Sequence, residues 1–232
     1  AYFDQKKADA AIEWIERHCF HTEGPKAPQK LKMELWQKAF FSCVYGIVDK
    51  NGLRQFQEVM LVVGRKNGKT KIASSLGNYD FQSSEYGTRD FCLAPKLEQA
   101  DLVYNDIWQM VQRDPDYKKL KEILSEKDEH NRKIRDDSEL PRHRMTDLAI
   151  LATNSTVKKI AFSAKKSDGF NPSLCICDEI ASWEGDAGLK QYEVMKSGMG
   201  ARPEGLLLSV TTSGYINDSI YDELLKRSTR FL

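Results

Sequence analysis

A glycine-bearing turn joins an apolar run to a helix-compatible run at Val62-Val63-Gly64-Arg65-Lys66-Asn67-Gly68-Lys69-Thr70. Residues 59–63 before it are apolar and residues 71–76 after it suit a helix, so the expected order is strand, turn, helix. In this order the backbone N–H groups of the turn and the helix N-terminus favour an anion, and the lysine adds a mobile positive charge. The turn therefore predicts a phosphate-binding loop, with the Thr70 hydroxyl as a candidate Mg²⁺ ligand.

The turn departs from the common pattern GxxxxGK[ST], which would place a glycine at Val63, whereas the nearest glycine is Gly64. Taken alone, a Gly-Lys-Thr tripeptide is equally compatible with an ordinary exposed turn. The interpretation as a phosphate site therefore depends on which polar residues end the other strands.

The composition indicates a soluble globular protein, because 41% of the 232 residues are hydrophobic and 30% are charged. No apolar run approaches the roughly twenty residues that span a bilayer, and residues 1–7 lack the apolar core of a signal peptide. The net charge of +1 predicts that any contact with nucleic acid is made by a local patch. The five cysteines form no CxxC pair, which favours buried thiols in a reducing compartment over disulfides or a zinc site.

Helical and strand patterns alternate along the chain. We expect a helix over residues 4–21 with Asp4 as its N-cap, and a second helix that buries one stripe, composed of Trp36, Phe40, Cys43 and Ile47. Further helices are expected at 95–112 and 187–197 and around Ile216, Ile220 and Leu224, and strands at 57–63, 90–94, 148–152, 157–162, 174–178 and 206–210. Several of these strands are apolar throughout, which predicts a parallel sheet covered on both faces.

The charged residues 114–147 are expected to form a solvated excursion or, less often, a surface that faces DNA.

Three expected strands end in polar residues, and ligands of an open parallel sheet bind at the carboxyl ends of its strands. One strand ends in the glycine-bearing turn, one in Asp178-Glu179 and one in Thr211-Thr212-Ser213. Asp178 would orient the shell of a magnesium ion, and Glu179 would polarise an attacking water. An Asp-Glu pair alone commonly just begins a loop, but together with the Gly-Lys-Thr turn it favours nucleotide hydrolysis.

These residues resemble the ATPase part of the large terminase subunit of tailed phages, a motor that packs DNA into procapsids. The segments that carry the resemblance are Leu35-Trp36-Gln37, Arg65-Lys66-Asn67-Gly68-Lys69-Thr70, Ala94-Pro95-Lys96-Leu97-Glu98-Gln99-Ala100, Gly169-Phe170-Asn171-Pro172-Ser173-Leu174 with Asp178-Glu179, and Gly200-Ala201-Arg202-Pro203 with Thr211-Thr212-Ser213-Gly214. The second segment is similar to the family's variant Walker A, which carries an arginine and need not begin with glycine. The resemblance implies a P-loop NTPase fold of the RecA-like (ASCE) type, with a mainly parallel sheet flanked by helices.

The resemblance also implies residue roles. Gln37 would read the adenine edge, with Trp36 in the core, and Lys69 would bind the β- and γ-phosphates. Arg65 would reach the γ-phosphate as a cis-acting arginine. Glu179, Lys69 and Arg65 would be the catalytic residues and Thr70 and Asp178 would serve the metal, while the nucleotide would be held by Gln37, Arg65, Lys66, Asn67, Gly68, Lys69, Thr70, Thr211 and Thr212.

At the scale of the whole motor, the resemblance implies ATP and Mg²⁺ as cofactors and double-stranded DNA as a partner, together with the portal protein and the small terminase subunit in the host cytoplasm. The subunits would form a ring on the procapsid, with a monomer in isolation, and a trans-acting finger would come from Arg202, Lys165 or Lys166. Residues 1–50 would be a helical lead-in and 51–232 the ATPase core. The C-terminal nuclease domain of the family would be absent, so no DNA cleavage is expected.

Three alternatives remain from the residues alone. A helicase-like translocating ATPase would share the same core chemistry. A nucleotide-binding scaffold that does not hydrolyse is less favoured, since it has no chemical need for Glu179. A phosphotransferase acting on small substrates is the least favoured, because no acceptor pocket is recognisable.

Overall fold

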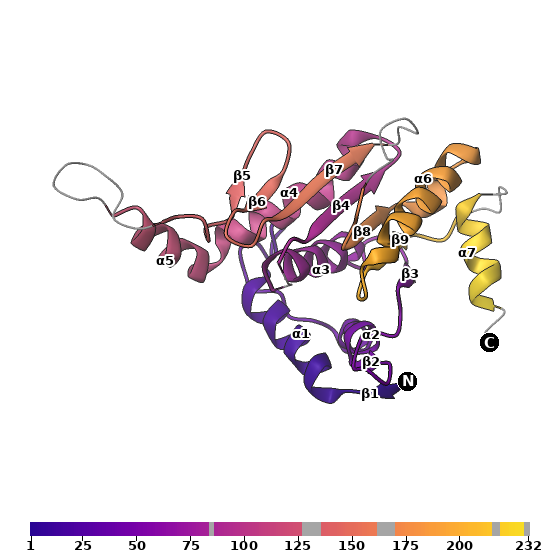
Figure 1. The fold of residues 1–232 in the computed structure, drawn as a ribbon, viewed down its shortest axis with the longest axis horizontal. Coiled ribbons are helices and arrows are strands. Elements are labelled where there is room, and N and C mark those ends of the chain that lie inside the picture. The colour runs from indigo at the N-terminus through magenta and orange to yellow at the C-terminus, as the bar shows by residue number, and fades with distance from the viewer. Residues whose placement is uncertain (84–85, 127–135, 162–169, 215–218, 230–232) are drawn as a thin grey trace.

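The computed structural model describes residues 1–83, 86–126, 136–161, 170–214 and 219–229. Helices and strands alternate along most of the chain (Figure 1). The helices are α1 (Gln5–His18), α2 (Leu35–Gly46), α3 (Lys69–Ser83), α4 (Leu97–Arg113), α5 (Pro115–Leu124), α6 (Gly185–Gly198) and α7 (Ile220–Thr229), with the 3₁₀ turns η1 (Ile180–Ser182) and η2 (Met199–Ala201). The strands are β1 (Tyr2–Phe3), β2 (Ile47–Val48), β3 (Glu58–Val62), β4 (Arg89–Ala94), β5 (Arg142–His143), β6 (Leu148–Ile150), β7 (Ser155–Ala161), β8 (Leu174–Asp178) and β9 (Leu206–Thr211).

Within the described residues, the central sheet has seven strands in the order β3-β9-β8-β4-β7-β6-β5. The first five strands in this order, β3, β9, β8, β4 and β7, pair in parallel. The last two, β6 and β5, pair antiparallel beside β7. The predicted mainly parallel sheet is therefore confirmed. Strand β9 lies between β3 and β8, so the strands that end in the glycine-bearing turn and in Asp178 are separated by the strand that ends in Thr211.

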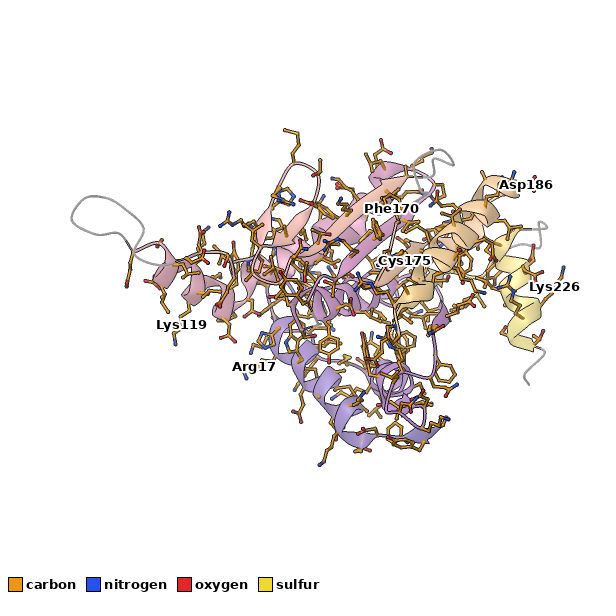
Figure 2. All side chains as sticks on the ribbon, in the orientation of Figure 1. Arg17, Lys119, Phe170, Cys175, Asp186 and Lys226 are labelled. Atoms are coloured by element: carbon orange, nitrogen blue, oxygen red, sulfur yellow. The ribbon has the colours of Figure 1, made fainter. Side chains whose placement is uncertain are left out.

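The sheet is covered on both faces, and residues of its central strands alternate between two apolar clusters, as the strand period of two requires. In β8, Leu174 and Ile176 pack in the cluster that contains residues of α3 and α4. Cys175 and Cys177 share the other face and pack in the other cluster, with residues of α6 and α7. In Figure 2, Cys175 lies inside the molecule, whereas Lys119 lies at its rim.

Helix α1 begins where the sequence predicts, because the Asp4 carboxylate accepts a hydrogen bond from Lys7 N at 3.2 Å and so caps the helix. The helix ends at His18, short of residue 21. Ile15 and Cys19 are fully buried. Helices α1 and α2 pack against each other, and α1 also contacts α3, beside the sheet (Figure 1).

The expected buried stripe of α2 was wrong. Phe41 and Val44 form the buried face of this helix, whereas Trp36 is 40% exposed and Cys43 is exposed. Aromatic residues stand next to each other at positions 40 and 41, so two stripes at helical spacing were available and the pattern could not choose between them. The expectation that all thiols are buried was wrong for Cys43 alone.

The charged region 114–147 contains helix α5 and the short strand β5, and residues 127–135 lie outside the described part of the chain. The predicted Ile216 of the last helix also lies outside it, while Ile220 and Leu224 are buried in α7. Among the described residues, no helix is both long and apolar enough to cross a bilayer.

Candidate active site

The glycine-bearing turn lies between the end of β3 and the start of α3, so the predicted order of strand, turn and helix is confirmed. Lys66 and Gly68 adopt left-handed backbone conformations, with φ of 66° and 79°. Asn67 Nδ2 donates to the carbonyl oxygen of Gly64 at 3.1 Å, which closes the turn. Because α3 begins at Lys69, its unpaired N–H groups and its partial positive charge lie beside this turn, as a phosphate cradle requires.

The Asp-Glu pair lies next to the lysine of this turn. Lys69 Nζ is 3.0 Å from Asp178 Oδ1 and also contacts Glu179 Oε1. The side chains of Lys69 and Asp178 are 11% and 6% exposed, whereas that of Glu179 is 38% exposed and open to water. Burial raises the pKa of Asp178 above its ordinary value, and the Lys69 ammonium partly offsets the rise. These residues are far apart in sequence. They meet because β3 and β8 run parallel, so that their carboxyl ends lie together, at what is called here the carboxyl edge of the sheet.

Glu179 is held in a strained backbone conformation, with φ of 52° and ψ of 46° in the left-handed region. Three donors stabilise it: Ser182 N and Ser182 Oγ bond to Glu179 O at 2.7 and 2.8 Å, and Trp183 Nε1 bonds to Asp178 O at 2.9 Å. Sequence reasoning missed Ser182 and Trp183. The signal available was a tryptophan placed within two turns of an acid pair that ends an apolar strand.

The Thr211-Thr212 segment touches both the phosphate-binding turn and the turn after Glu179. Thr211 O accepts from Val63 N at 3.1 Å, and Thr211 Oγ1 accepts from Ala181 N at 3.3 Å. Thr211 Oγ1 also donates to Thr212 O at 2.8 Å. Gly214 packs so closely that a Cβ there would lie 2.6 Å from Ala181 Cβ. A displacement of this segment would therefore move both the phosphate-binding turn and the turn that follows Glu179.

Gln37 lies beside the phosphate-binding turn. Its Oε1 accepts from Glu34 N at 2.9 Å, as part of a capping box at the start of α2. Its Nε2 faces the turn, since a Cβ placed at Gly68 would lie 3.5 Å from it. Trp36, expected in the core, is instead partly exposed next to it.

The other residues predicted for the site do not all lie at the phosphate-binding turn. Arg65 and Lys66 are exposed on the turn, and Thr70 lies in the first turn of α3. Arg202 lies at the opposite edge of the sheet, where Nη2 donates to Gly87 O at 2.8 Å and Nε to Asn171 Oδ1 at 3.1 Å. The other two finger candidates, Lys165 and Lys166, lie outside the described residues.

The donors gathered at the carboxyl edge suit a hard cation bound together with a phosphate. The Thr70 hydroxyl and the Asp178 carboxylate provide the oxygen ligands that Mg²⁺ prefers, one on the helix and one at the neighbouring strand end. Lys69 supplies the positive charge for phosphate oxygens between them. The residues present therefore fit a magnesium nucleotide.

A phosphate-binding turn at the end of β3, with the acid pair one strand beyond β9, defines the class of P-loop NTPase folds. The family model described as "Terminase large subunit, ATPase domain" matches residues 35–230, and the chain belongs to this family.

Known relatives agree with this assignment. The large terminase subunit of Enterobacteria phage HK97 is 25% identical over 208 residues, which cover 89% of this chain and 36% of that protein. The crystal structure of the HK97 large terminase superposes with a TM-score of 0.69 at 25% identity, over 96% of this chain and 42% of that one. The UvsW helicase of bacteriophage T4, at 13% identity and a TM-score of 0.51 over 91% of this chain and 61% of that one, shares the fold alone. The chain thus spans 36% of the HK97 protein in the sequence comparison and 42% of it in the structural one.

Proposed function

We propose that this chain hydrolyses ATP with Mg²⁺ and that hydrolysis drives the movement of double-stranded viral DNA into a procapsid. The observation that carries the ATPase part is the meeting of Lys69 with Asp178 and Glu179 at one edge of the sheet. Membership of the terminase ATPase family supports the packaging part.

In the proposed reaction, Glu179 accepts a proton from the attacking water. The water oxygen forms a bond to the γ-phosphorus while the bond from that phosphorus to the bridging oxygen breaks, which leaves ADP and phosphate. Mg²⁺ neutralises charge on the phosphates when it is bound. Lys69 stabilises the negative charge on the β- and γ-phosphate oxygens, and Thr70 and Asp178 hold the metal and its water shell.

Lys69 has two competing sets of partners in this scheme. In the structure its ammonium contacts both acids. The phosphate oxygens of bound ATP would compete for the ammonium, and Glu179 would then be free to bind the attacking water.

The surrounding residues complete the proposal. Gln37 would recognise adenine, Arg65 would approach the γ-phosphate, and Lys66, Asn67 and Gly68 would contribute backbone N–H groups. Thr211 and Thr212 would transmit the loss of the γ-phosphate, because Thr211 contacts both Val63 and Ala181 and is hydrogen-bonded to Thr212.

A ring of such subunits would also need a finger residue from the neighbouring copy, and Arg202, Lys165 and Lys166 are the candidates. Arg202 is too far from its own phosphates to serve in cis, because the six residues of β9 separate it from Thr211 by roughly 20 Å. Its place at the opposite edge of the sheet suits a role in a neighbouring site. The portal protein and the small terminase subunit would be the further partners of this motor, in the host cytoplasm.

The test of the proposed function is the substitution Glu179→Gln, which keeps the size of the side chain but removes the base. We expect the variant to bind ATP as tightly as the parent, while hydrolysis falls by about 10²–10⁴-fold. Phosphate release and the binding of a fluorescent ATP analogue measure the two quantities separately. Hydrolysis at the parent rate would show that Glu179 is not the base. Unwinding of a forked duplex by the parent would instead favour a helicase-like activity.

A further inference from the structure

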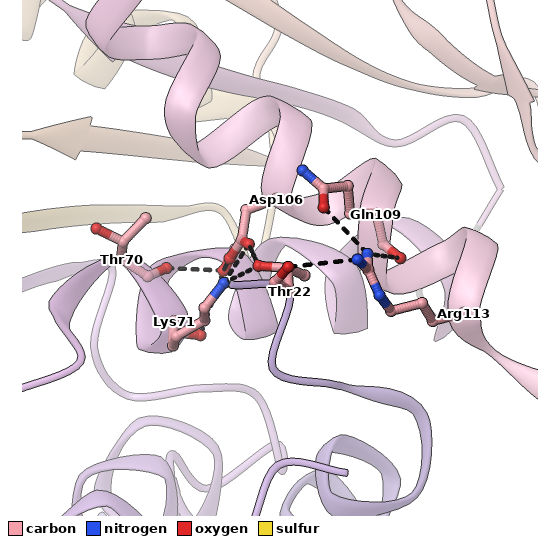
Figure 3. A network of polar contacts seen from close by, with 7 residues as sticks. Thr22, Thr70, Lys71, Asp106, Gln109 and Arg113 are labelled. Carbon is pink, nitrogen blue, oxygen red and sulfur yellow. Dashed lines mark hydrogen bonds and ion pairs between the residues drawn. The ribbon is translucent and has the colours of Figure 1, made fainter. Parts of the chain in front are cut away.

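A buried polar network lies directly behind the phosphate-binding turn and joins α3, α4 and the segment that follows α1 (Figure 3). At its centre, the Asp106 carboxylate on α4 accepts from Ser74 Oγ, from Lys71 Nζ and from Thr22 Oγ1. Lys71 Nζ also donates to Thr22 Oγ1. Asp106, Ser74 and Thr22 are all nearly inaccessible to solvent, so these contacts are shielded from water.

One branch of the network reaches the residue expected to bind magnesium. Ser74 Oγ lies 2.7 Å from the backbone oxygen of Thr70 and also contacts the Asp106 carboxylate, so that its single hydroxyl proton is shared between two acceptors. Lys71 follows Thr70 in the chain, so its ion pair with Asp106 is a second restraint on the first turn of α3. Two contacts from one carboxylate therefore restrain the turn that carries Lys69 and Thr70.

A second branch reaches the segment that leads towards Gln37. Thr22 donates its hydroxyl to Asp106, while its backbone oxygen accepts from Arg113 Nη2 at 3.3 Å. Arg113 is itself held by the side chain and the backbone of Gln109, at 3.0 and 3.2 Å (Figure 3). The same carboxylate thus restrains the helix that carries the phosphate ligands and the segment that precedes the expected adenine contact.

A second acid–lysine pair on α4 provides a comparison for this network. Asp101, one and a half turns before Asp106 on the same helix, contacts Lys159 of β7 and accepts from Asn105. Among the described residues, the hydrogen bonds and ion pairs of this pair run to the sheet and within α4. The two pairs share their charges and their helix, and they differ in two ways. Asp101 is 31% exposed where Asp106 is 6% exposed, and the Asp106 pair alone involves a residue of α3.

We propose that Asp106 is a positioning residue of the ATP site, which orients the first turn of α3 so that Thr70 and Lys69 meet a magnesium nucleotide. The inference rests on the proposed function, since it concerns how that site binds its metal nucleotide. Asp106 acts through Lys71 and Ser74 and has no contact with the nucleotide itself. Partners in the shell behind metal ligands typically alter metal affinity by about 10–100-fold.

The test separates positioning from fold stability by removing both charges. The double substitution Lys71→Met with Asp106→Leu replaces a largely buried ion pair by apolar side chains, which is often neutral for stability. We expect the variant to fold with a lower melting temperature than the parent, because the buried Thr22 hydroxyl loses both of its side-chain partners. Measured well below both melting temperatures, it should need about a tenfold higher Mg²⁺ concentration for half-maximal binding of a fluorescent ATP analogue. The matched control, Lys159→Met with Asp101→Leu, should keep the Mg²⁺ requirement of the parent.

A more conservative variant keeps the proposal testable if the double variant does not fold. Asp106→Asn keeps the shape of the side chain and an acceptor oxygen, and we expect it to raise the Mg²⁺ requirement by less than the double variant does. A double variant with the Mg²⁺ requirement of the parent would overturn the positioning role while leaving the proposed function intact, as would an equal rise in the control. A folded parent chain that binds no nucleotide would overturn the proposed function and this inference together.

Discussion

Two groups of buried acids lie at the two ends of the parallel strands, which are called here the carboxyl edge and the amino edge. The negative charge of each group is balanced in a different way. At the carboxyl edge, Asp178 has the Lys69 ammonium 3.0 Å away. At the amino edge, Asp90 of β4 lies near Asp80 of α3, and burial together with the Asp80 carboxyl raises the pKa of Asp90 well above its ordinary value. The positive charges of Arg202 and Arg89 only partly counter this rise.

The comparison shows that a perturbed carboxyl group does not by itself identify an active site. The amino-edge pair lies away from the phosphate-binding turn, and Asp80 lines a cavity of about 330 Å³. At the carboxyl edge, by contrast, the compensating charge belongs to a flexible side chain that phosphate oxygens can attract. The carboxyl edge also differs in that Glu179 beside the buried acid is 38% exposed.

The largest effect on nucleotide affinity is expected from Lys69→Ala, which removes the counter-ion at the carboxyl edge. Nucleotide affinity should fall by about 10–100-fold, because a hydrogen bond to a charged group contributes roughly 1.5–3 kcal/mol. Titration with a fluorescent ATP analogue measures this loss. The matched control is Lys159→Ala, which removes a lysine paired with Asp101 outside the site. Equal nucleotide affinities of the parent and of Lys69→Ala would show that this turn does not bind phosphate.

A smaller effect, on stability alone, is expected from Asp90→Asn at the amino edge. Because the pKa of folded Asp90 lies above its unfolded value of about 3.9, this group stabilises the fold fully below that value, and its contribution is lost as pH rises through the folded pKa. Asparagine removes this loss, so the variant should gain stability relative to the parent as pH increases. Urea unfolding at several pH values measures the difference.

ATP hydrolysis by Asp90→Asn should match that of the parent at every pH at which both are folded. A stability difference that does not change with pH would contradict the raised pKa of Asp90. A loss of hydrolysis would contradict the distinction between the two edges of the sheet.

The site residues that end strands could be predicted from the sequence. The turn at 64–70, Asp178-Glu179 and Thr211-Thr212 each follow an apolar run, and parallel strands bring such ends to one edge. The insertion of β9 between β3 and β8 could not be read in advance, because pairing order depends on contacts between segments far apart in the chain.

Other features left no periodic signal in the sequence. The contact of Thr22 with Asp106 joins residues separated by 84 positions, and the side chains involved would suit an exposed surface equally well. The buried face of α2 was misassigned because adjacent aromatic residues, Phe40 and Phe41, offered two helical stripes. Arg202 was grouped with the site by its motif, and only the fold shows that it lies at the other edge.

The central claim is that ATP releases Lys69 from the two acids and so frees Glu179 to act. A crystal structure of this chain with Mg²⁺ and a non-hydrolysable ATP analogue tests it directly. We expect Lys69 Nζ on phosphate oxygens, no longer in contact with Glu179, with a water between Glu179 and the γ-phosphate. A bound nucleotide with Lys69 still in contact with both Asp178 and Glu179 would contradict the account.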